Sequence, residues 1–439
     1  MDLRIFPPED LIEDGLVSLP LSKSILNRRL ILDAMTPGAE IPAAGAPDEG
    51  ADVAALRSIV RAVTASEKGT MELNAGESGT ALRFLTAWLA TRGEGQEYIL
   101  TGLPGLFRRP VAPLVDALRT LGADIEYIDK EGYAPLRIKS HPMKGGSVTV
   151  DPTVSSQYVS ALLLAAPLMK DGVRITFDGE PSSLPYIKMT AGMMRRRGVD
   201  VELTPLSAEV APGKYHPDTE PAEADWSATA FWYETVALTA GWVTMTCPDG
   251  RMTLPEESIQ GDAKAAEFFG CLGVLTEPSE ERDNALQLSP SPEVYGRLDL
   301  DLKDYPDLTP ALAVTCCMLG VPFHFTGLGA LSVKESDRLS AIVEEMAKVG
   351  CEVEKIRTYG LEWDGKRHPI FQLPEFDPRN DHRLAMALAP VAAYIPGIVV
   401  KDVECVAKSY PGFWHQLSGL GFRFADASAN SSQEAPAEV

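Results

Sequence analysis

The sequence has no excess of basic residues. It contains 40 Lys and Arg residues against 62 Asp and Glu residues, so its formal net charge is −22. A chain without a general basic field does not attract nucleic acids or anionic membrane surfaces. We therefore expect no nucleic acid and no membrane among its partners. Small anionic ligands are not excluded, because they respond to the charge of a few nearby side chains.

Metal-ligand and nucleotide-binding motifs are also missing. The six cysteines show no CxxC spacing, and no two of the six histidines lie at the spacing of a zinc site. Neither the P-loop nor the dinucleotide fingerprint occurs. The sequence therefore predicts no metal and no cofactor. Most cysteines lie in apolar stretches, which favours reduced, buried thiols in a cytosolic protein.

The sequence shows no secretory signal and no membrane span. Its start, MDLRIFPPED, has no basic segment followed by an apolar stretch. The most apolar long run, between Arg383 and Lys401, is short for a bilayer span and contains Pro390 and Pro396. We expect a buried helix followed by a strand in this run, and a cytoplasmic protein.

An internal repeat runs through most of the chain. Five segments combine an amphipathic helix, a glycine near its end and an alternating strand. Glycine is the expected left-handed residue at a helix C-terminus, and alternation predicts a half-buried strand. A degraded first copy is predicted in ALRSIVRAVTASEKG, residues 55–69. The five glycines follow one another at intervals of 71 to 77 residues: Gly122, Gly198, Gly273, Gly350 and Gly421.

A second type of helix recurs with a similar period, and its members are apolar on most faces. Each is expected to begin at a residue whose side-chain oxygen can accept from the first-turn N–H groups. These predicted caps are Ser22, Ser78, Ser155, Asp225, Asp307 and Asn380. The chain is therefore read as six helix–strand units, which must stack to bury their apolar faces.

Six units in 439 residues predict two domains of three units each. We expect a lower domain over residues 21–223 and an upper domain over residues 1–20 and 224–426. The polar residues 427–439 are expected to be a disordered tail.

Cationic residues concentrate near the starts of the apolar helices. Lys23, Arg28, Arg83 and Arg383 all lie in or close to these first turns. A cation opposes the positive end of the helix dipole, so a bound anion that offsets this cost is expected. Any one of these residues could instead be solvated or paired with a local carboxylate. The hypothesis of an anion site rests on all of them together.

The segment VKESDRL adds a second group of charges. It either opens a helix as a charged cap, with Ser336 as the capping residue, or belongs to a site. In a site, Lys334 and Arg338 would reach an anion and Glu335 would work as an acid or base. His382 is equally open between a structural and a catalytic residue.

Several short motifs resemble those of the 5-enolpyruvylshikimate-3-phosphate synthases, in that family's order and up to about Phe422. The pair VKESDR and NDHRLAM is the most specific, and related transferases acting on UDP-N-acetylglucosamine lack it. The matching segments are SKSILNRR (22–29), GESGTALR (76–83), RRP (108–110), SSQ (155–157), PYI (185–187), PD (306–307), VKESDR (333–338), NDHRLAM (380–386) and AKSYP (407–411).

The resemblance implies a two-domain α/β fold, an inside-out α/β barrel of six βαβαββ-type repeats with the first repeat shortened. It implies transfer of the carboxyvinyl group of phosphoenolpyruvate to the 5-hydroxyl of 3-phosphoshikimate, through a tetrahedral intermediate and without metal or cofactor. This step belongs to chorismate and aromatic amino acid biosynthesis. The expected partners are the two anionic small molecules, and we expect a monomer.

The resemblance also implies residue roles. Asp307 would take the proton of the 5-hydroxyl, Glu335 would handle the proton at the methylene carbon, and Lys23 and His382 would assist. The residues implied for 3-phosphoshikimate are Lys23, Ser24, Arg28, Ser155, Ser156, Gln157, Ser183, Asp307 and Lys334. Those implied for phosphoenolpyruvate are Lys23, Gly79, Arg109, Gln157, Arg338, Arg383 and Lys408.

The chain departs from the family pattern at several positions. Leu21 replaces a glycine, Glu77 and Ala330 each replace an asparagine, and residues 104–107 contain no arginine. An acidic residue is unexpected beside an anion site. Two alternatives therefore stay open. One is a UDP-N-acetylglucosamine enolpyruvyl transferase, although no cysteine lies in the expected polar loop. The other is a non-catalytic anion-binding member, which Glu77 and Ala330 favour.

Overall fold

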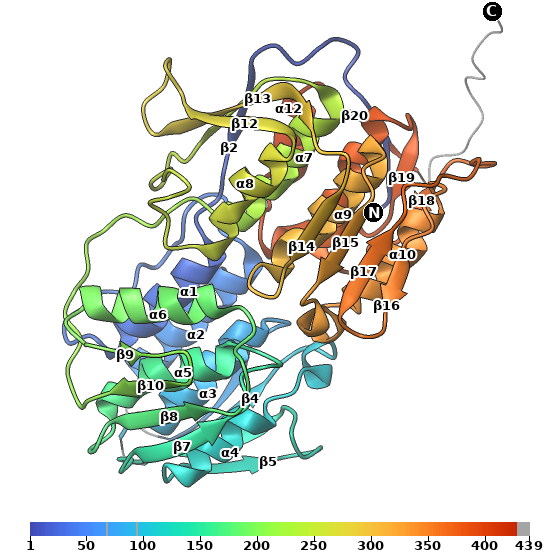
Figure 1. The fold of residues 1–439 in the computed structure, drawn as a ribbon. Coiled ribbons are helices and arrows are strands. Elements are labelled where there is room, and N and C mark those ends of the chain that lie inside the picture. The colour runs from blue at the N-terminus through green and yellow to red at the C-terminus, as the bar shows by residue number, and fades with distance from the viewer. Residues whose placement is uncertain (67–68, 94, 428–439) are drawn as a thin grey trace, which may run out of the picture.

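The structure is a computed structural model that describes residues 1–66, 69–93 and 95–427. It is a mixed α/β protein of two lobes, which Figure 1 shows one above the other. The lower lobe contains α1–α6 and β3–β10, and the upper lobe contains the remaining elements. Strands from the two ends of the chain, β1 and β20, pair side by side in the upper lobe. The predicted tail lies, apart from residue 427, outside the described residues.

The strands form five four-stranded sheets with one shared pairing pattern. In each sheet a parallel pair is extended by two antiparallel pairs, as in the order β3-β4-β6-β5. Over the described residues no sheet closes into a barrel. The lower sheets contain β3 (Gly69–Asn74), β4 (Gln96–Thr101), β5 (Asp124–Tyr127), β6 (Leu136–Ser140), β7 (Gly146–Val150), β8 (Val173–Phe177), β9 (Glu202–Leu203) and β10 (Ser207–Val210).

The three upper sheets repeat the pattern in the orders β12-β13-β11-β2, β14-β15-β17-β16 and β18-β19-β1-β20. Their strands are β1 (Leu3–Phe6), β2 (Gly15–Ser18), β11 (Val243–Thr246), β12 (Leu272–Pro278), β13 (Ala285–Val294), β14 (Leu298–Asp301), β15 (Phe323–Thr326), β16 (Glu354–Ile356), β17 (Gly360–Trp363), β18 (Glu375–Phe376), β19 (Ile398–Val400) and β20 (Arg423–Asp426).

The helices fall into the two predicted types. The apolar helices are α1 (Lys23–Met35), α3 (Gly79–Ala90), α5 (Gln157–Ala165), α7 (Trp226–Thr239), α9 (Thr309–Leu319) and α11 (His382–Leu388), and nearly every residue of the last five is buried. The amphipathic helices are α2 (Ala51–Ala65), α4 (Ala112–Thr120), α6 (Leu184–Arg196), α8 (Ala265–Gly270), α10 (Arg338–Ala347) and α12 (Phe413–Gly419).

Short 3₁₀ segments join these elements: η1 (Leu106–Arg108), η2 (Ala166–Leu168), η3 (Gly261–Lys264), η4 (Pro306–Leu308), η5 (Gly329–Val333), η6 (Ala389–Ala393) and η7 (Val403–Lys408). The apolar run after Arg383 is α11 and η6 followed by β19, as predicted. Within the described residues, no helix is long and apolar enough to cross a membrane.

The repeat glycines have the predicted left-handed backbone, with φ between +78° and +106°. Four of them follow the end of an amphipathic helix. Gly273 does not: it lies inside β12, where the register against β13 shifts. The prediction that it ends a helix was therefore wrong, because α8 stops at Gly270 and a bulge uses the left-handed residue instead.

Ser78 and Asp225 are confirmed as caps, because their side chains accept from first-turn N–H groups. Ser22 is confirmed in position only, because its hydroxyl makes no capping hydrogen bond. At α5 the residue before the helix is Ser156, but the Ser155 hydroxyl accepts from the Gln157 N–H at 3.3 Å. The predicted caps of α9 and α11 are wrong. Asp307 lies in η4, one turn before α9, and its carboxylate contacts cations. Asp381 caps α11 because its side chain accepts from the Arg383 N–H, whereas Asn380 has a left-handed backbone. Likewise Asp337, not Ser336, caps α10.

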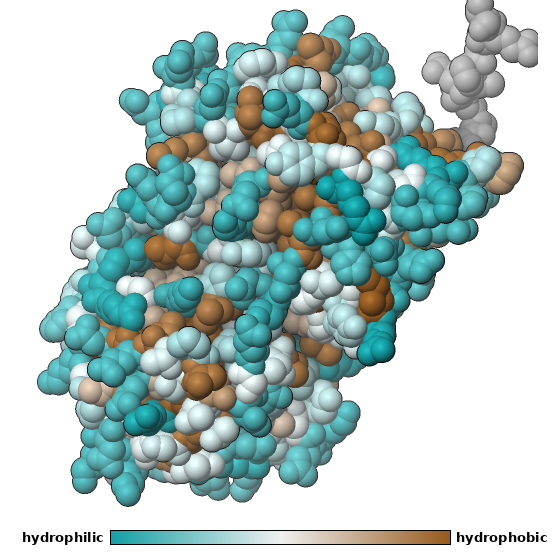
Figure 2. All heavy atoms as spheres, in the orientation of Figure 1, coloured by the Kyte–Doolittle hydropathy of each residue, from teal (hydrophilic) through white to brown (hydrophobic). Residues whose placement is uncertain are grey.

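Two buried clusters hold the lobes together internally. One contains apolar residues between positions 25 and 222, and the other contains residues 3–19 and 224–422. Between β2 and β3 the described residues contain the helices α1 and α2 but no strand. The face shown in Figure 2 is mostly hydrophilic, with apolar residues in separate patches.

Candidate active site

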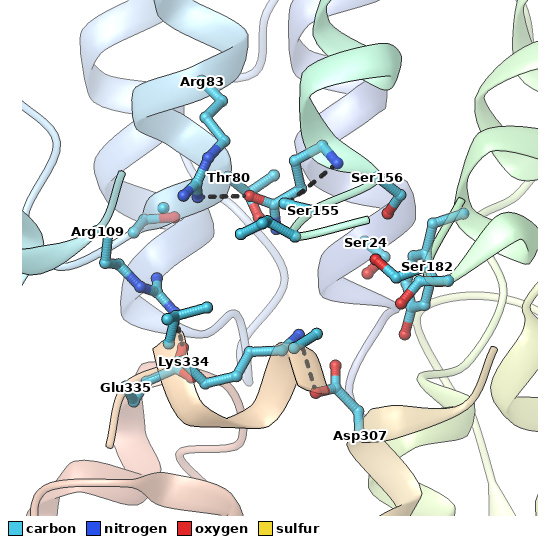
Figure 3. Close-up of a pocket in the computed structure, with 18 of the residues that line it drawn as sticks. Ser24, Thr80, Arg83, Arg109, Ser155, Ser156, Ser182, Asp307, Lys334 and Glu335 are labelled. Atoms are coloured by element: carbon cyan, nitrogen blue, oxygen red, sulfur yellow. Dashed lines mark hydrogen bonds and ion pairs between the residues drawn. The ribbon is translucent and has the colours of Figure 1, made fainter. Parts of the chain in front are cut away.

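The cleft between the lobes holds a cavity with about 970 Å³ of empty space, its open mouth included. Side chains from both lobes line it, and Figure 3 shows several of them converging. Every residue predicted for the site lines this cavity except Lys408, which lies behind Glu335. Binding pockets for small molecules commonly lie between domains.

Helix N-termini surround the cavity. The first turns of α1, α3, α5, α10 and α11 contribute lining residues, and η4 before α9 contributes Asp307. The N-terminus of α7 contributes none. Its cap, Asp225, accepts from the N–H groups of Ser227 and Ala228 and also from that of Lys23. Of the six apolar helices, α7 is therefore the one without a lining residue at or just before its start.

At the start of α3, the glycine at position 79 lets two arginine side chains approach the backbone closely. A Cβ at Gly79 would lie 2.5 Å from the nearest guanidinium nitrogen of Arg83 and 2.6 Å from that of Arg109. The free N–H groups of the first turn therefore lie beside two guanidinium groups. This combination of helix N-terminus and cations favours a phosphate or carboxylate.

Arg83 and Gln157 form a fixed pair on the floor of the lower lobe. Arg83 donates to Gln157 Oε1 at 2.8 Å, and Gln157 Nε2 donates to the Thr80 hydroxyl at 3.0 Å (Figure 3). Burial lowers the pKa of Arg83. Within the described residues its Nε has no hydrogen-bond partner. A buried guanidinium that is incompletely paired indicates a place for an anion.

Arg28 gives a second buried cation, deeper in the lower lobe. It donates to the Thr190 hydroxyl at 2.7 Å and to the backbone oxygens of Ser24 and Tyr186 at 2.9 and 3.2 Å. These partners are neutral, and burial lowers the Arg28 pKa to about 10. The guanidinium remains charged at neutral pH, so a substrate anion can pair with it. Ser155, Ser156 and Ser183 line the same part of the cavity.

Asp307 is held by three cations of the upper lobe. Its carboxylate lies 3.4 Å from Lys334 Nζ, 2.8 Å from Arg338 Nη1 and 3.2 Å from Arg383 Nη2. Burial by itself would raise the Asp307 pKa, but these cations outweigh it and hold the pKa well below its ordinary value. Asp307 is therefore ionised.

Glu335 connects the two lobes. Its carboxylate lies 2.9 Å from Arg338, 3.1 Å from Arg109 of the lower lobe and 3.6 Å from Lys408. Burial favours the neutral acid, but Arg109, Arg338 and Lys408 together hold the Glu335 pKa well below its ordinary value. Without substrate, Glu335 is ionised and pairs with the same cations that are expected to bind the substrate.

Lys23 and His382 lie on the two sides of the cleft. Lys23 Nζ is 3.3 Å from Asp52 Oδ2, and Asp52 lies at the start of α2. His382 is 1% exposed, and neither ring nitrogen has a hydrogen-bond partner among the described residues. Burial, with help from the Lys23 charge, lowers the His382 pKa well below its ordinary value. The imidazole is therefore neutral.

The departures from the family pattern have distinct surroundings. Glu77 accepts a hydrogen bond from the Asn380 side-chain amide at 3.2 Å and lies 3.9 Å from Lys408 Nζ. Ala330 lines the cavity without a polar group. Leu21 lies outside the cavity, in a bridge to Ala224 between the lobes.

Other lining residues were not assigned to the site from the sequence, notably Asp52, Ser182 and Tyr186, and Arg83 was noticed only as a cation in a helix. Of these residues, only Tyr186 could have been found from the sequence, because the PYI motif places it close to Ser183. No motif pointed to Asp52, which lies just before the degraded first repeat.

Comparisons with known proteins agree with this geometry. Residues 13–417 match the family model described as EPSP synthase (3-phosphoshikimate 1-carboxyvinyltransferase). A 3-phosphoshikimate 1-carboxyvinyltransferase of Bacteroides fragilis is 39% identical over 409 residues, which are 92% of this chain and 95% of the relative. One of Methanoculleus marisnigri is 30% identical over 93% of this chain and 97% of its own length. The solved EPSP synthase of Acinetobacter baumannii superposes with a TM-score of 0.71 at 21% identity, over 97% of this chain and 100% of that one.

Proposed function

This chain belongs to the EPSP synthase (3-phosphoshikimate 1-carboxyvinyltransferase) family, and we infer that it catalyses the reaction for which the family is named. It transfers the carboxyvinyl group of phosphoenolpyruvate to the 5-hydroxyl of 3-phosphoshikimate and releases phosphate, in aromatic amino acid biosynthesis. The observation that carries this inference is one cavity where cations of both lobes surround two ionised carboxylates. The names of the relatives do not favour UDP-N-acetylglucosamine as the acceptor.

We propose that 3-phosphoshikimate binds mainly to the lower lobe. The neutral surroundings of Arg28 support this, because a substrate anion would supply its missing counter-charge. Asp307 faces this region from the upper lobe and can accept the 5-hydroxyl proton. The full proposed set is Lys23, Ser24, Arg28, Ser155, Ser156, Gln157, Ser183, Asp307 and Lys334.

Phosphoenolpyruvate is proposed to bind across the cleft, between the start of α3 and the cations of the upper lobe. The absence of a side chain at Gly79 supports this placement. So does the buried ammonium of Lys408, which is ion-paired with Glu335 but has no hydrogen-bond partner among the described residues. The full proposed set is Lys23, Gly79, Arg109, Gln157, Arg338, Arg383 and Lys408.

In the proposed reaction the 5-hydroxyl oxygen bonds to C2 of phosphoenolpyruvate, its proton passes to Asp307, and C3 gains a proton from Glu335. The C2–O bond to phosphate then breaks, C3 returns a proton to Glu335, and the phosphate leaves with the proton that Asp307 had taken. Glu335 can donate only after it has gained a proton. Substrate anions would take over Arg109 and Lys408, and burial would then raise the Glu335 pKa. Neutral His382 and the ammonium of Lys23 lie close enough to assist.

Several further expectations are proposed on the same basis. The five similar sheets and the α1–α2 pair support six units in an inside-out barrel with a shortened first unit. The two buried clusters support domains over 21–223 and over 1–20 with 224–426. Free, mostly buried cysteines support a cytoplasmic location. A monomer whose partners are small anions, without nucleic acid or membrane, completes the proposal.

The experiment is a phosphate-release assay with phosphoenolpyruvate and either 3-phosphoshikimate or UDP-N-acetylglucosamine. We expect release only with 3-phosphoshikimate. Lys23→Ala and Glu335→Gln should each lower kcat by roughly 10²- to 10⁴-fold while the circular dichroism spectrum is unchanged. Binding of 3-phosphoshikimate without any phosphate release would instead support a non-catalytic member.

A further inference from the structure

Asp262 is a buried carboxylate that the proposed reaction does not use. It lies in η3 of the upper lobe and is 1% exposed. Its Oδ2 accepts hydrogen bonds from the Tyr186 hydroxyl, at 3.1 Å, and from the Ser227 hydroxyl. Its Oδ1 has no hydrogen-bond partner among the described residues. Burying a half-satisfied carboxylate is costly, so its place in this fold needs a reason.

The contact between Asp262 and Tyr186 joins the two lobes at the edge of the cavity. Tyr186 belongs to α6 of the lower lobe and lines the cavity. Its backbone oxygen accepts from Arg28 Nη2 at 3.2 Å, and its ring centroid lies 5.9 Å from the Arg28 guanidinium carbon. A carboxylate of the upper lobe is thus connected through one tyrosine to Arg28, a buried cation of the lower lobe.

The backbone at this junction allows no extra atoms. A Cβ at Gly261 would lie 2.5 Å from the Cβ of Pro185. The start of η3 therefore packs directly on the first turn of α6, and this packing sets how closely Asp262 approaches Tyr186. Nearby, Asp304 accepts from the Leu184 N–H at 3.0 Å, which is a second contact between the lobes.

We propose that Asp262 is a positioning residue for 3-phosphoshikimate, which orients the Tyr186 hydroxyl and the Tyr186–Arg28 pair when the lobes meet. This inference rests on the proposed function. Because the Tyr186 O–H is donated to Asp262, its oxygen turns only acceptor lone pairs toward the cavity. That oxygen can accept from a hydroxyl of the substrate, and anionic oxygens are left to Arg28 and the serines.

The charges around Asp262 make the effect dependent on pH. The groups that face it are Asp307, Arg383, Ser227 and Tyr186. Burial, together with the Asp307 charge, raises the Asp262 pKa to about 6, and Arg383 opposes this shift. The carboxylate is therefore charged above about pH 6 and neutral below it. An asparagine at this position resembles the neutral form at every pH.

The test is a double-mutant cycle of Asp262→Asn and Tyr186→Phe. For each variant we would measure KM for both substrates, kcat, and the dissociation constant of 3-phosphoshikimate by calorimetry. We expect each single change to raise KM and Kd for 3-phosphoshikimate roughly tenfold, as for a lost charge-assisted hydrogen bond. KM for phosphoenolpyruvate should stay within about twofold, and the double variant should be no worse than the poorer single one.

Asp304→Asn is the matched control, because it alters a contact between the lobes that does not involve the Tyr186 hydroxyl. It should leave KM for 3-phosphoshikimate unchanged. The ratio of wild-type to Asp262→Asn affinity should shrink toward one below about pH 6. Unchanged affinity in Asp262→Asn, multiplicative effects in the double variant, or an equal loss in Asp304→Asn would overturn the proposal.

Two outcomes separate this inference from the function on which it rests. A wild-type protein that releases no phosphate would contradict the proposed reaction, while the Kd cycle would still decide the role of Asp262. If Asp262→Asn does not fold, the affinity and pH profile of Tyr186→Phe decide it. A Tyr186→Phe loss that is the same at all pH values would then count against Asp262.

Discussion

Glu77 places a carboxylate one residue before the cap of α3, where phosphoenolpyruvate is proposed to bind. It is paired with Asn380 and lies near Lys408, so in the ligand-free protein it partly neutralises a cation of the site. The sequence identified Glu77 as unexpected but did not show its partners. They lie more than 300 residues away along the chain, and only the folded structure brings them together.

Glu77→Gln should lower KM for phosphoenolpyruvate by roughly three- to tenfold with little change in kcat. The amide can still accept from Asn380, and a like charge worth about 1 kcal/mol at a partly exposed position is removed. Steady-state kinetics at low and high salt would measure this, because the gain should shrink as salt screens the charge. Glu72→Gln, on the exposed face of β3, is the control. An increase in KM would contradict the account.

Glu234 is a buried acid in a helix whose other residues are mostly apolar. It lies in α7 and is 0% exposed, and within the described residues both carboxyl oxygens lack a partner. Burial raises its pKa well above the ordinary value, so the folded protein holds this group neutral. No sequence pattern indicated this, because α7 reads as an apolar helix whatever the state of one acid.

The raised pKa fixes the sign of a stability effect. The folded state binds the Glu234 proton more tightly than the unfolded state does. The stability that this proton contributes is fully present below the unfolded pKa and is lost as pH rises through the folded pKa. As pH rises, Glu234→Gln should therefore become progressively more stable than the wild type. The difference in unfolding free energy should grow by up to about 1.4 kcal/mol per pH unit. Melting temperatures measured from about pH 5 to pH 8 check this. A constant difference across that range would be inconsistent with a buried neutral acid.

Among the helices and strands, α3 is an element whose start was predicted correctly from the sequence. The repeat and the cap Ser78 predicted this helix and its direction. This was possible because a capping hydrogen bond forms between residues that are close together in the sequence. The caps of α9 and α11 were misplaced because Asp307 and Asn380 serve longer-range contacts instead. Tertiary partners therefore decided the helix ends where local signals were ambiguous.

Gly79→Ala tests whether the α3 start is an anion site. The added methyl would lie within 2.6 Å of guanidinium nitrogens of Arg83 and Arg109, so both must move. We expect kcat/KM for phosphoenolpyruvate to fall by roughly 10- to 100-fold, because a small misplacement of binding groups is costly. KM for 3-phosphoshikimate should change less. Gly76→Ala would not be a clean control, since φ there is +61°, whereas Gly192→Ala in α6 meets no atom within 4 Å and serves as one. Unchanged kinetics in Gly79→Ala would contradict the assignment.

In the whole molecule, the two lobes contact each other through charged and polar side chains at the cleft, and several of these are also proposed to bind the substrates. Arg109 pairs with Glu335, Tyr186 with Asp262 and Asn380 with Glu77, each across the cleft. The sequence predicted two halves and most of the lining residues, because the repeat period and the motifs are local features. It could not predict which cation contacts which carboxylate, because that depends on how the lobes close.

The central claim is that this cleft moves a carboxyvinyl group between its two anionic ligands. Phosphorus NMR of the purified protein with phosphoenolpyruvate and 3-phosphoshikimate tests it directly. We expect the phosphoenolpyruvate signal to disappear as inorganic phosphate and one new phosphate monoester appear in equal amounts, and Glu335→Gln to slow all three changes together. Unchanged phosphoenolpyruvate, or inorganic phosphate formed without the new monoester, would contradict it.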